Sequence, residues 1–314
     1  MEKHYEKTVI GGYKEFHHKL KNDPILFDNC KDKSITVNRN YSMEADIKQP
    51  KPFVKWIGGK RSIINELLRR IPKQINNYYE PFVGGGALFF EIYNSVNHSY
   101  LSDLNVDLIV AYNTIKNEPR KLIELLSKHR ENHNEEYYYK IRALQDLQDP
   151  IENSARFIYL MKTCFNGLYR VNKNNEFNTP IGSYEDPNIC DKENILSVSQ
   201  TLECATIKCQ DFTKITPQKG DFVYFDPPYH PTSEDSFTKY LSNGFSEKDQ
   251  TRLRDFALEL TKAGINIMIS NSDAEFIVDI YKKNFNINRV SAPRVVNCKA
   301  DKRQSVYETL IMGF

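Results

Sequence analysis

The sequence predicts an α/β fold in which a single sheet is interrupted by a helical insertion. Between residues 53 and 115, strand patterns alternate with helical patterns, which is typical of a doubly wound sheet. Residues 118–202 are mostly helical, and strand patterns return near residue 205 and then alternate with helices. Together these three observations predict one sheet domain that contains an inserted helical unit.

The composition is that of a globular protein and argues against several classes. Among 314 residues, 40% are hydrophobic and the net charge is only +2, so any DNA-binding face must come from local clustering. No apolar run is long enough to span a membrane, and the polar N-terminus lacks a signal-peptide region. The six cysteines form no C-x-x-C pair. We therefore expect a cytoplasmic protein with free thiols and no metal.

The first half of the sheet follows a polar N-terminal stretch. Residues 1–51 contain no motif and form an extension of unknown role, either a small extra element or a mobile arm. A proline-rich linker at 48–52 leads into a glycine turn and an amphipathic helix with apolar residues from 63 to 71, which Pro72 stops. "NYYEPFVGGGALFFEIYNSV" predicts a strand, a glycine turn and a helix, and "YLSDLN" predicts a second strand.

The second half predicts the remaining strands. "ATIKCQDF" and "DFVYFDPPY" have strand patterns, and residues 247–264 form a helix that ends at a glycine. A strand at 265–272 and a helix at 273–284 follow, and residues 285–293 and 305–314 have the pattern of a hairpin.

The glycine triplet Gly84 to Gly86 predicts a close approach of the backbone to a ligand. A turn between strand and helix places helix amides next to such a ligand, although a plain turn remains the alternative. Asp103 ends the next predicted strand about 20 residues on, where Rossmann-type sites keep an acid for ribose hydroxyls.

Two other nucleotide motifs do not match. A phosphate-binding P-loop at "VKWIGGKRS" would need Gly at position 54 and Ser or Thr at 61, where this chain has Val54 and Arg61. In the G-x-G-x-x-G pattern of nicotinamide sites, the third glycine position falls on Phe89. A nicotinamide site is therefore only the second choice.

The stretch "DPPY" ends an apolar strand with an acid, two prolines and an aromatic ring. Asp226 and the Pro227 carbonyl can each accept a hydrogen bond from an amino group, and Pro227 and Pro228 restrict the backbone. Tyr229 can present a ring face to a flat heterocycle. This set matches an exocyclic amine on a base, whereas the alternative is a strand end with a surface acid.

The motifs "KWIGGK", "EPFVGGG", "SDLN" and "DPPY", in this order, resemble those of Dam-type adenine-N6 DNA methyltransferases. "CFNGLYRVNKNNEFNTPIG" resembles the family's target-recognition segment, and the resemblance covers about Lys51 to the C-terminus. It implies a Rossmann-like, S-adenosylmethionine-dependent methyltransferase sheet, residues 52–117 and 203–314, with an inserted helical target-recognition domain, residues 118–202. It also implies methyl transfer to N6 of adenine in double-stranded DNA.

The same resemblance assigns roles to individual residues. For the target adenine it implies a pocket formed by Asp226–Tyr229. For the cofactor it implies contacts from Trp56, Lys60, Phe82, and Gly84 with its neighbouring glycines. Within the cofactor site, Asp103 would bind the ribose, Asp211 and Phe212 the adenine, and Asp226 would lie near the methionine end. Each has a structural alternative: Trp56 could be core, Lys60 a solvated lysine at a helix start, and Asp211 a turn acid.

For DNA, the resemblance implies contacts from Phe165, Asn166, Leu168 and Arg170, with GATC as the target. Phe165 would wedge into the stack and Arg170 would bind guanine O6 and N7. The alternatives are core packing for Phe165 and Leu168, and a phosphate contact for Arg170.

In one respect the chain departs from the family, which often has basic residues after "N-x-P-x-G". This chain has Ser183, Tyr184 and Glu185 there, so a phosphate contact at that point is in doubt. The basic segment 298–304 is a candidate replacement, with a solvated turn as its alternative.

Two rival functions remain at this stage. One is a methyltransferase that acts on RNA or on a protein glutamine, and the other is a non-catalytic DNA-binding module with the same fold. We expect a monomer or weak dimer, and the sequence leaves protein partners and membership of a restriction system open.

Overall fold

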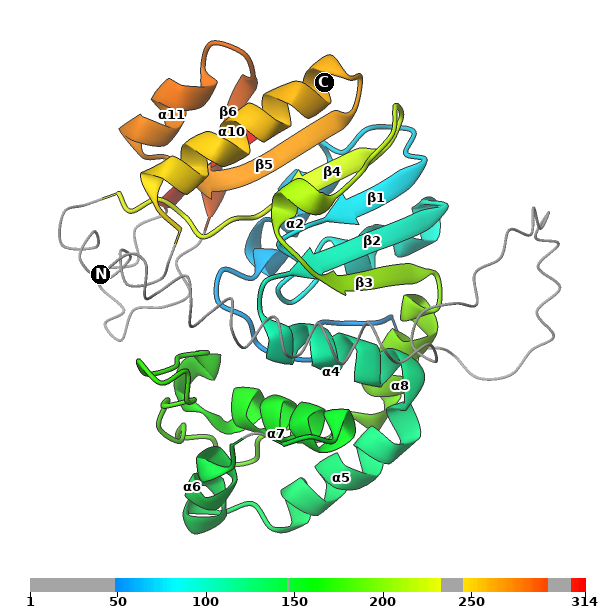
Figure 1. Ribbon diagram of the computed structural model, residues 1–314, viewed down its shortest axis with the longest axis vertical. Helices are drawn as coiled ribbons and strands as arrows, with labels where there is room; N and C mark the ends of the chain where they lie inside the picture. The colour runs from blue at the N-terminus through cyan, green and yellow to red at the C-terminus, as the bar shows by residue number, and fades with distance from the viewer. Residues whose placement is uncertain (1–48, 146, 233–244, 293–305) are drawn as a thin grey trace, which may run out of the picture. The chain divides into compact units, whose positions relative to one another are not determined.

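The computed structural model describes residues 49–145, 147–232, 245–292 and 306–314 (Figure 1). The chain divides into two units, Met1–Asp46 and Ile47–Phe314, and every described residue belongs to the second. Most of the N-terminal extension and the basic segment 298–304 therefore lie outside the described residues.

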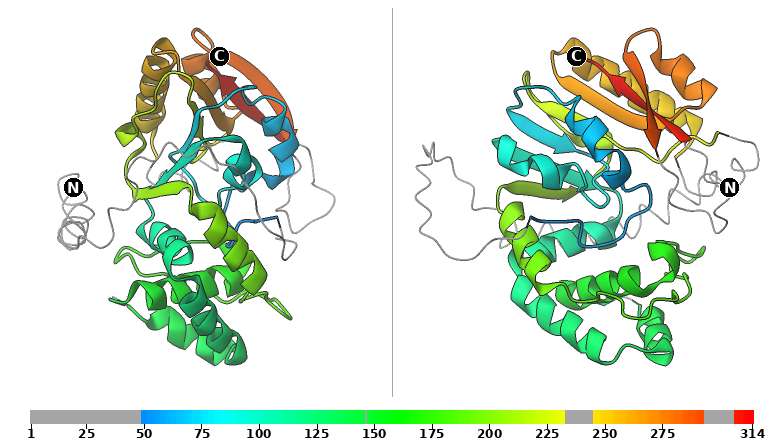
Figure 2. Two further views of the ribbon diagram at one scale, coloured as in Figure 1. Left: turned by 90° about the vertical axis from the view of Figure 1, so that its right-hand side faces the viewer. Right: turned by 180° about the vertical axis from the view of Figure 1, so that it is seen from behind.

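The described strands form one seven-stranded sheet with the order β3-β2-β1-β4-β5-β7-β6. The strands are β1 (Asn77–Glu80), β2 (His98–Asp103), β3 (Ala205–Cys209), β4 (Phe222–Phe225), β5 (Asn266–Ser272), β6 (Asn286–Ala292) and β7 (Val306–Met312). Strands β1 to β5 run parallel to one another, and β7 is antiparallel to both β5 and β6 (Figure 2). The predicted α/β class and the final hairpin are confirmed.

The strand order reverses direction between β1 and β4. From β1 the chain moves outward through β2 to β3, and it then returns to place β4 on the other side of β1. In open α/β sheets, ligands bind at such a switch point, in the crevice at the carboxyl ends of the strands. The ends of β1, β2 and β4 are therefore where a site is expected.

The helices divide between the sheet and the insertion. They are α2 (Ile64–Leu68), α3 (Phe89–Ile92), α4 (Val106–Asn117), α5 (Pro119–Glu131), α6 (Glu135–Ala143), α7 (Pro150–Thr163), α8 (Lys192–Leu202), α10 (Glu247–Lys262) and α11 (Glu275–Tyr281), with single 3-10 turns η2 (Lys60–Ile63), η3 (Tyr93–Ser95), η4 (Phe165–Gly167) and η5 (Phe212–Lys214). Helix α4 contacts β2, β3, α7 and α8, so it joins the two groups. All views place the α5–α7 helices beyond the β3 edge of the sheet (Figures 1 and 2).

The insertion and the sheet share one hydrophobic core. The cluster that contains Tyr78 of β1 and Leu101 of β2 also contains Leu122 of α5 and Ile158 of α7. Because apolar side chains of the sheet and of the insertion are buried together, the hydrophobic effect stabilises the position of the insertion against the sheet. The role of the insertion in DNA recognition remains a prediction.

Two helices are shorter than the sequence predicted. Helix α2 ends at Leu68 rather than near residue 71, because the amides of Arg70 and Ile71 both donate to the Leu67 carbonyl and tighten the last turn before Pro72. Helix α3 has only four residues and starts at Phe89. It therefore contributes little dipole at the glycine turn, contrary to the expectation that its amides would favour an anion there.

No helix among the described residues is long and apolar enough to cross a membrane.

Candidate active site

The carboxyl ends of three neighbouring parallel strands each carry an acidic side chain, at the place where the crevice of an open α/β sheet is expected. Glu80 ends β1, Asp103 ends β2, and Asp226 follows β4 directly. Because β1 lies between β2 and β4 in the sheet, these three acids occupy neighbouring strand ends. Asp103 and Asp226, 123 positions apart in the chain, thus lie at neighbouring positions around the switch point of the strand order, where ligands of α/β proteins bind.

Lys60 and Asp226 form an ion pair at the carboxyl end of β4. The Lys60 Nζ atom lies 2.8 Å from Asp226 Oδ2, and the two side chains are 5% and 19% exposed. Nζ also donates to the Gly58 carbonyl and lies 4.7 Å from the centroid of the Tyr229 ring. Lys60 is therefore not the solvated lysine that was the structural alternative.

Burial raises the pKa of Asp226 to about 6, although the charge of Lys60 and its hydrogen bond act to lower it. Near neutral pH the side chain is thus mostly a carboxylate. Its second oxygen, Oδ1, is buried and has no hydrogen-bond partner among the described residues. A buried acceptor without a donor is costly, which makes this atom a binding point for a ligand N–H.

Tyr229 is oriented by a residue that sequence reasoning missed. Its hydroxyl donates to Oε2 of Glu308, on β7, at 2.6 Å. Burial, together with the negative charges of Asp226 and Glu308, raises the pKa of Tyr229 well above its usual value. The ring is thus held between Glu308 at its hydroxyl and Lys60 at its face. Only the strand alternation around Glu308 could have suggested an inward acid.

Glu80 is a second buried acid that the sequence did not single out. It is 3% exposed, and Tyr78 donates a hydrogen bond to its Oε2 at 3.0 Å. Burial, with a smaller contribution from the nearby Asp226 charge, raises the pKa of Glu80 to about 8, although the hydrogen bond from Tyr78 acts to lower it. The feature of the sequence that could have pointed to Glu80 is its position as the first residue of the motif "EPFVGGG".

The glycine turn is tied to the end of β2. Asp103 Oδ2 accepts from the Gly84 amide at 3.1 Å, and Oδ1 accepts from the Asn105 amide at 2.9 Å. Burial raises the pKa of Asp103, and these amides partly offset the effect. Gly84 has φ +46°, and an added Cβ would lie 2.6 Å from Trp56 Cδ1. Only glycine allows Trp56 to pack on this turn.

Trp56 also links the turn to the insertion. The indole is half-buried and stacks on Tyr169 with ring centroids 5.9 Å apart, while Phe157 lies at 6.4 Å. The Tyr169 hydroxyl in turn donates to Asp107 at the start of α4, at 3.0 Å. Trp56 is thus part of a packed cluster, as its structural alternative held, while its half-exposed ring stays open to a ligand.

Asp211 and Phe212, the pair predicted from "CQDF", lie at the start of η5. Phe212 is 2% exposed and stacks on Phe82, with centroids 5.4 Å apart, while the Arg252 guanidinium lies over its ring at 4.5 Å. Arg252 also binds Asp211 at 3.0 Å. Burial alone would raise the pKa of Asp211, but hydrogen bonds from Thr213 and the charge of Arg252 hold it below its usual value. Asp211 therefore caps a turn, and Phe82 is the more exposed ring.

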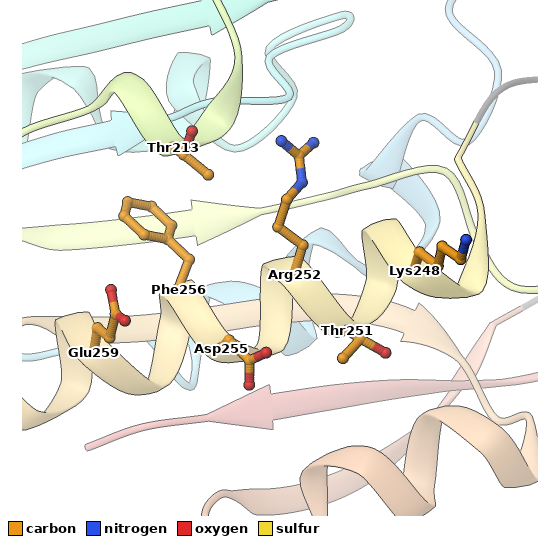
Figure 3. Close-up of a pocket in the computed structure, with 7 residues that line it drawn as sticks. All are labelled: Thr213, Lys248, Thr251, Arg252, Asp255, Phe256 and Glu259. Carbon is orange, nitrogen blue, oxygen red and sulfur yellow. The ribbon is translucent and has the colours of Figure 1, made fainter. Parts of the chain in front are cut away.

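A shallow depression runs along α10 beside this cluster (Figure 3). Its lining includes Arg252, Phe256 and Thr213, and the Arg252 side chain points from α10 towards the Thr213 segment. Neither Asp226 nor Lys60 lines it. The depression is lined by Arg252, which contacts both Asp211 and Phe212, and it is therefore not the Asp226 site.

The four predicted DNA contacts lie together in and after η4, apart from the acids. Phe165 is 48% exposed, so it is not core, and Asn166 is exposed with φ +55°. Leu168 is half-buried. Arg170 is exposed, and its Nε and Nη2 donate to Asn178 Oδ1 and the Asn178 carbonyl at 2.6 and 3.1 Å. Asn178 thus holds the guanidinium in one direction.

The site has features that suit a nucleoside-bearing cofactor. Asp103 is held at a strand end beside a glycine turn, Phe82 offers a half-exposed ring, and Asp226 has an unsatisfied buried oxygen. Among the described residues, no group of three or more His, Cys, Asp and Glu side chains is placed to hold a metal ion.

Comparison with known proteins gives a family match over most of the chain. The profile of the D12 class N6 adenine-specific DNA methyltransferase family matches residues 56–296. The type II methyltransferase M1.LlaDCHI of Lactococcus lactis subsp. cremoris is 42% identical over 274 residues, which cover 84% of this chain and 95% of that protein.

Two further relatives are similar over comparable lengths. The type II methyltransferase M.MjaIII of Methanocaldococcus jannaschii is 42% identical over 288 residues, covering 84% of this chain and 99% of that protein. A DNA adenine methylase of Vibrio cholerae is 34% identical over 273 residues, covering 85% of this chain and 97% of that protein.

Proposed function

Because the chain belongs to the D12 class N6 adenine-specific DNA methyltransferase family, we propose that its Asp226 crevice receives an adenine flipped out of double-stranded DNA. The protein is an S-adenosylmethionine-dependent enzyme that methylates N6 of adenine in DNA. This excludes the RNA, glutamine and non-catalytic alternatives. The observation that supports the pocket is the buried Asp226 Oδ1, which lacks a donor among the described residues while Lys60 holds Oδ2.

Base flipping follows from where the reacting nitrogen lies in DNA. N6 of a paired adenine is inside the stack, so the base must leave the duplex at a cost of a few kcal/mol. Stacking on an aromatic ring returns about 1–3 kcal/mol per base. Tyr229, held by Glu308, provides such a ring next to Asp226.

The chain's own residues prepare the amine for attack. The N6 lone pair is delocalised into the purine ring, and it becomes available when both N–H bonds are directed at acceptors. Asp226 Oδ1 and the Pro227 carbonyl are these acceptors, and the Asp226 charge stabilises the positive charge that develops on nitrogen. S-adenosylmethionine, when bound, supplies an electrophilic methyl group and keeps the electron pair of the broken carbon–sulfur bond. One N6 proton then leaves to water.

The cofactor is proposed to lie along the ends of β1, β2 and β4. Asp103 would accept from the ribose hydroxyls, and Gly84 would allow close approach of the backbone. Trp56, Lys60 and Asp226 would line the methionine end. Phe82 would contact the adenine ring of the cofactor, because the Phe212 ring stacked behind it is almost fully covered. Asp211, held by Arg252, would lie at the edge of this adenine.

Gly84→Ala is expected to weaken S-adenosylmethionine binding by about 5–30-fold. The free variant would relax the turn to escape the cost of about 1–2 kcal/mol that a left-handed backbone imposes on a residue with a Cβ, and cofactor binding would have to restore that conformation. The added Cβ would also meet Trp56 Cδ1 at 2.6 Å. Titration calorimetry measures the affinity.

Gly264→Ala is the matched control for this variant. Gly264 also has a positive φ, +81°, but lies after α10, so its substitution should lower thermal stability and leave cofactor affinity unchanged. Equal cofactor affinity in Gly84→Ala and the wild type would remove the glycine turn from the site.

The η4 segment is proposed to read the DNA target. Phe165 would occupy the gap left by the flipped base, since it is exposed and carried by a tight turn. Asn166 and Leu168 would contact neighbouring bases. Arg170 would bind guanine, because Asn178 holds the guanidinium through Nε and Nη2 while the side chain stays exposed. The proposed target is GATC, and the site of action the cytoplasm.

Arg170→Ala is expected to reduce discrimination against an altered guanine by about 1–3 kcal/mol, or about 5–150-fold. Sequencing of methylated adenines in DNA from expressing cells tests both target and residue. The wild type should methylate GATC, and the variant should also methylate sites with a changed guanine.

Lys173→Ala is the control, since Lys173 is an exposed cation three residues after Arg170. It should lower DNA affinity without changing the methylated sequence. Methylation by the wild-type protein at sequences other than GATC would disprove the proposed target. The same set of methylated sequences in Arg170→Ala and the wild type would disprove the proposed role of Arg170.

A further inference from the structure

A buried polar network lies behind the "DPPY" loop. Gln250 of α10 is 1% exposed, and Asn271 and Ser272 at the end of β5 are 0% and 7% exposed. The Asn271 side-chain amide donates to Gln250 Oε1 at 3.0 Å, which joins the helix to the strand. Burying three polar side chains is costly unless their hydrogen bonds are made, so the network has one arrangement that satisfies it.

Besides the bond from the Ser272 amide to Asn271 Oδ1, the network makes three hydrogen bonds to the backbone of the loop. Gln250 Nε2 donates to the Pro228 carbonyl at 2.9 Å. The His230 amide donates to Asn271 Oδ1 at 3.2 Å, and Ser272 Oγ donates to the His230 carbonyl at 2.6 Å. Three backbone groups on residues 228 and 230 are thereby fixed from the side of α10 and β5.

The loop depends on this external support because of its prolines. Pro227 and Pro228 have no backbone N–H, so neither can hold the loop through its own amide. The Pro227 carbonyl receives none of the network's bonds. In the chain, Pro227 stands between Asp226 and Pro228, whose carbonyl the network fixes. Rotation at residue 228 would redirect both Pro227 and the Tyr229 ring.

We infer that Gln250 is a positioning residue for methyl transfer: with Asn271 and Ser272, it aims the Pro227 carbonyl and the Tyr229 ring at the adenine. This inference rests on the proposed role of the Asp226 pocket. The network touches neither base nor cofactor in that arrangement, so its effect is on the geometry of the reacting amine.

Gln250→Glu tests the inference, since a carboxylate still accepts from Asn271 but cannot donate to the Pro228 carbonyl. A misplacement of about 1 Å near a reacting group costs on the order of 100-fold in rate. We therefore expect kcat to fall by about 10–100-fold at pH 8, with little change in KM for DNA or S-adenosylmethionine. The deficit relative to wild type should shrink as the pH is lowered, because a protonated carboxyl can donate.

Asn194→Asp provides the matched control. Asn194 is 4% exposed, and its side chain donates to the Lys51 carbonyl at 2.9 Å and accepts from the Lys51 amide at 2.8 Å. It is thus another buried amide that holds a loop backbone. Its variant should keep kcat within about twofold of wild type at every pH, as substitutions away from a site do.

The outcomes separate this inference from the proposed pocket. Wild-type kcat in Gln250→Glu, or equal losses in both carboxyl variants, would overturn the role of Gln250. If Gln250→Glu fails a thermal-unfolding check, Ser272→Ala decides, because loss of the His230 bond should lower kcat severalfold and an unchanged kcat refutes the inference. Full turnover in Asp226→Asn would instead show that the pocket assignment itself is wrong.

Discussion

Asp226→Asn is expected to lower the single-turnover methylation rate by about 10²–10³-fold, the usual effect of removing one preorganised electrostatic contact. The amide keeps the shape of the side chain and one acceptor oxygen. That oxygen can serve Lys60 or the adenine amine, but not both, and the negative charge that stabilises the attacking nitrogen is gone. Single-turnover assays with a labelled methyl group measure the rate directly.

Asp221→Asn is the control for this prediction. Asp221 is 1% exposed and lies just before β4, at the opposite end of the strand from Asp226, where Oδ1 accepts from Asn77 and Oδ2 from the Gln218 amide. Its variant should lose thermal stability while its methylation rate remains near that of wild type. A rate in Asp226→Asn equal to that in Asp221→Asn would contradict the pocket.

Lys60→Met is expected to move the acid limb of the pH–rate profile to higher pH. Methylation requires the Asp226 carboxylate, so the wild-type rate should fall as the pH drops through about 6, the pKa to which burial raises this side chain. Lys60 lowers that pKa, and removing its charge must therefore raise it. At pH 7 a larger fraction of Asp226 should be protonated in the variant than in the wild type, so the variant should be slower there and recover part of its rate at higher pH.

Lys60→Arg is the companion variant, because it keeps the positive charge beside Asp226. Its acid limb should stay closer to that of wild type than the limb of Lys60→Met. Profiles are best measured by single turnover at saturating DNA and S-adenosylmethionine, so that weaker cofactor binding does not distort them. Overlapping limbs for Lys60→Met and the wild type would show that the ion pair does not control the acid.

Most of the architecture was predictable from sequence. The strands that end at Asp103 and at Phe225, the helix closed at Gly264 and the final hairpin all lie where their patterns predict. These segments combine a clear period with a clear stop, which makes local sequence sufficient. The short helices α2 and α3 were less predictable. Helix α2 ends early because the amides of Arg70 and Ile71 both donate to the Leu67 carbonyl, and α3 spans only four residues.

Several site residues could not have been found this way. Glu308 lies 79 residues from Tyr229 in the chain, and Gln250 lies 22 residues from Pro228 on an ordinary amphipathic helix. Each is a single polar residue in a periodic segment, and although the strand alternation around Glu308 could suggest that it faces inward, the local pattern does not show which partner either residue meets. Only the packing of α10 and the register of β7 against β5 place them.

The sequence by itself determined which segments are strands, which turns need glycine and which four residues close β4, because these depend on local backbone preferences. The tertiary structure alone decided that Lys60 would neutralise Asp226, that one oxygen of this acid would stay unsatisfied, and that Gln250 would hold the loop. Those facts depend on distances between segments far apart in the chain, and such distances are set when the whole core packs.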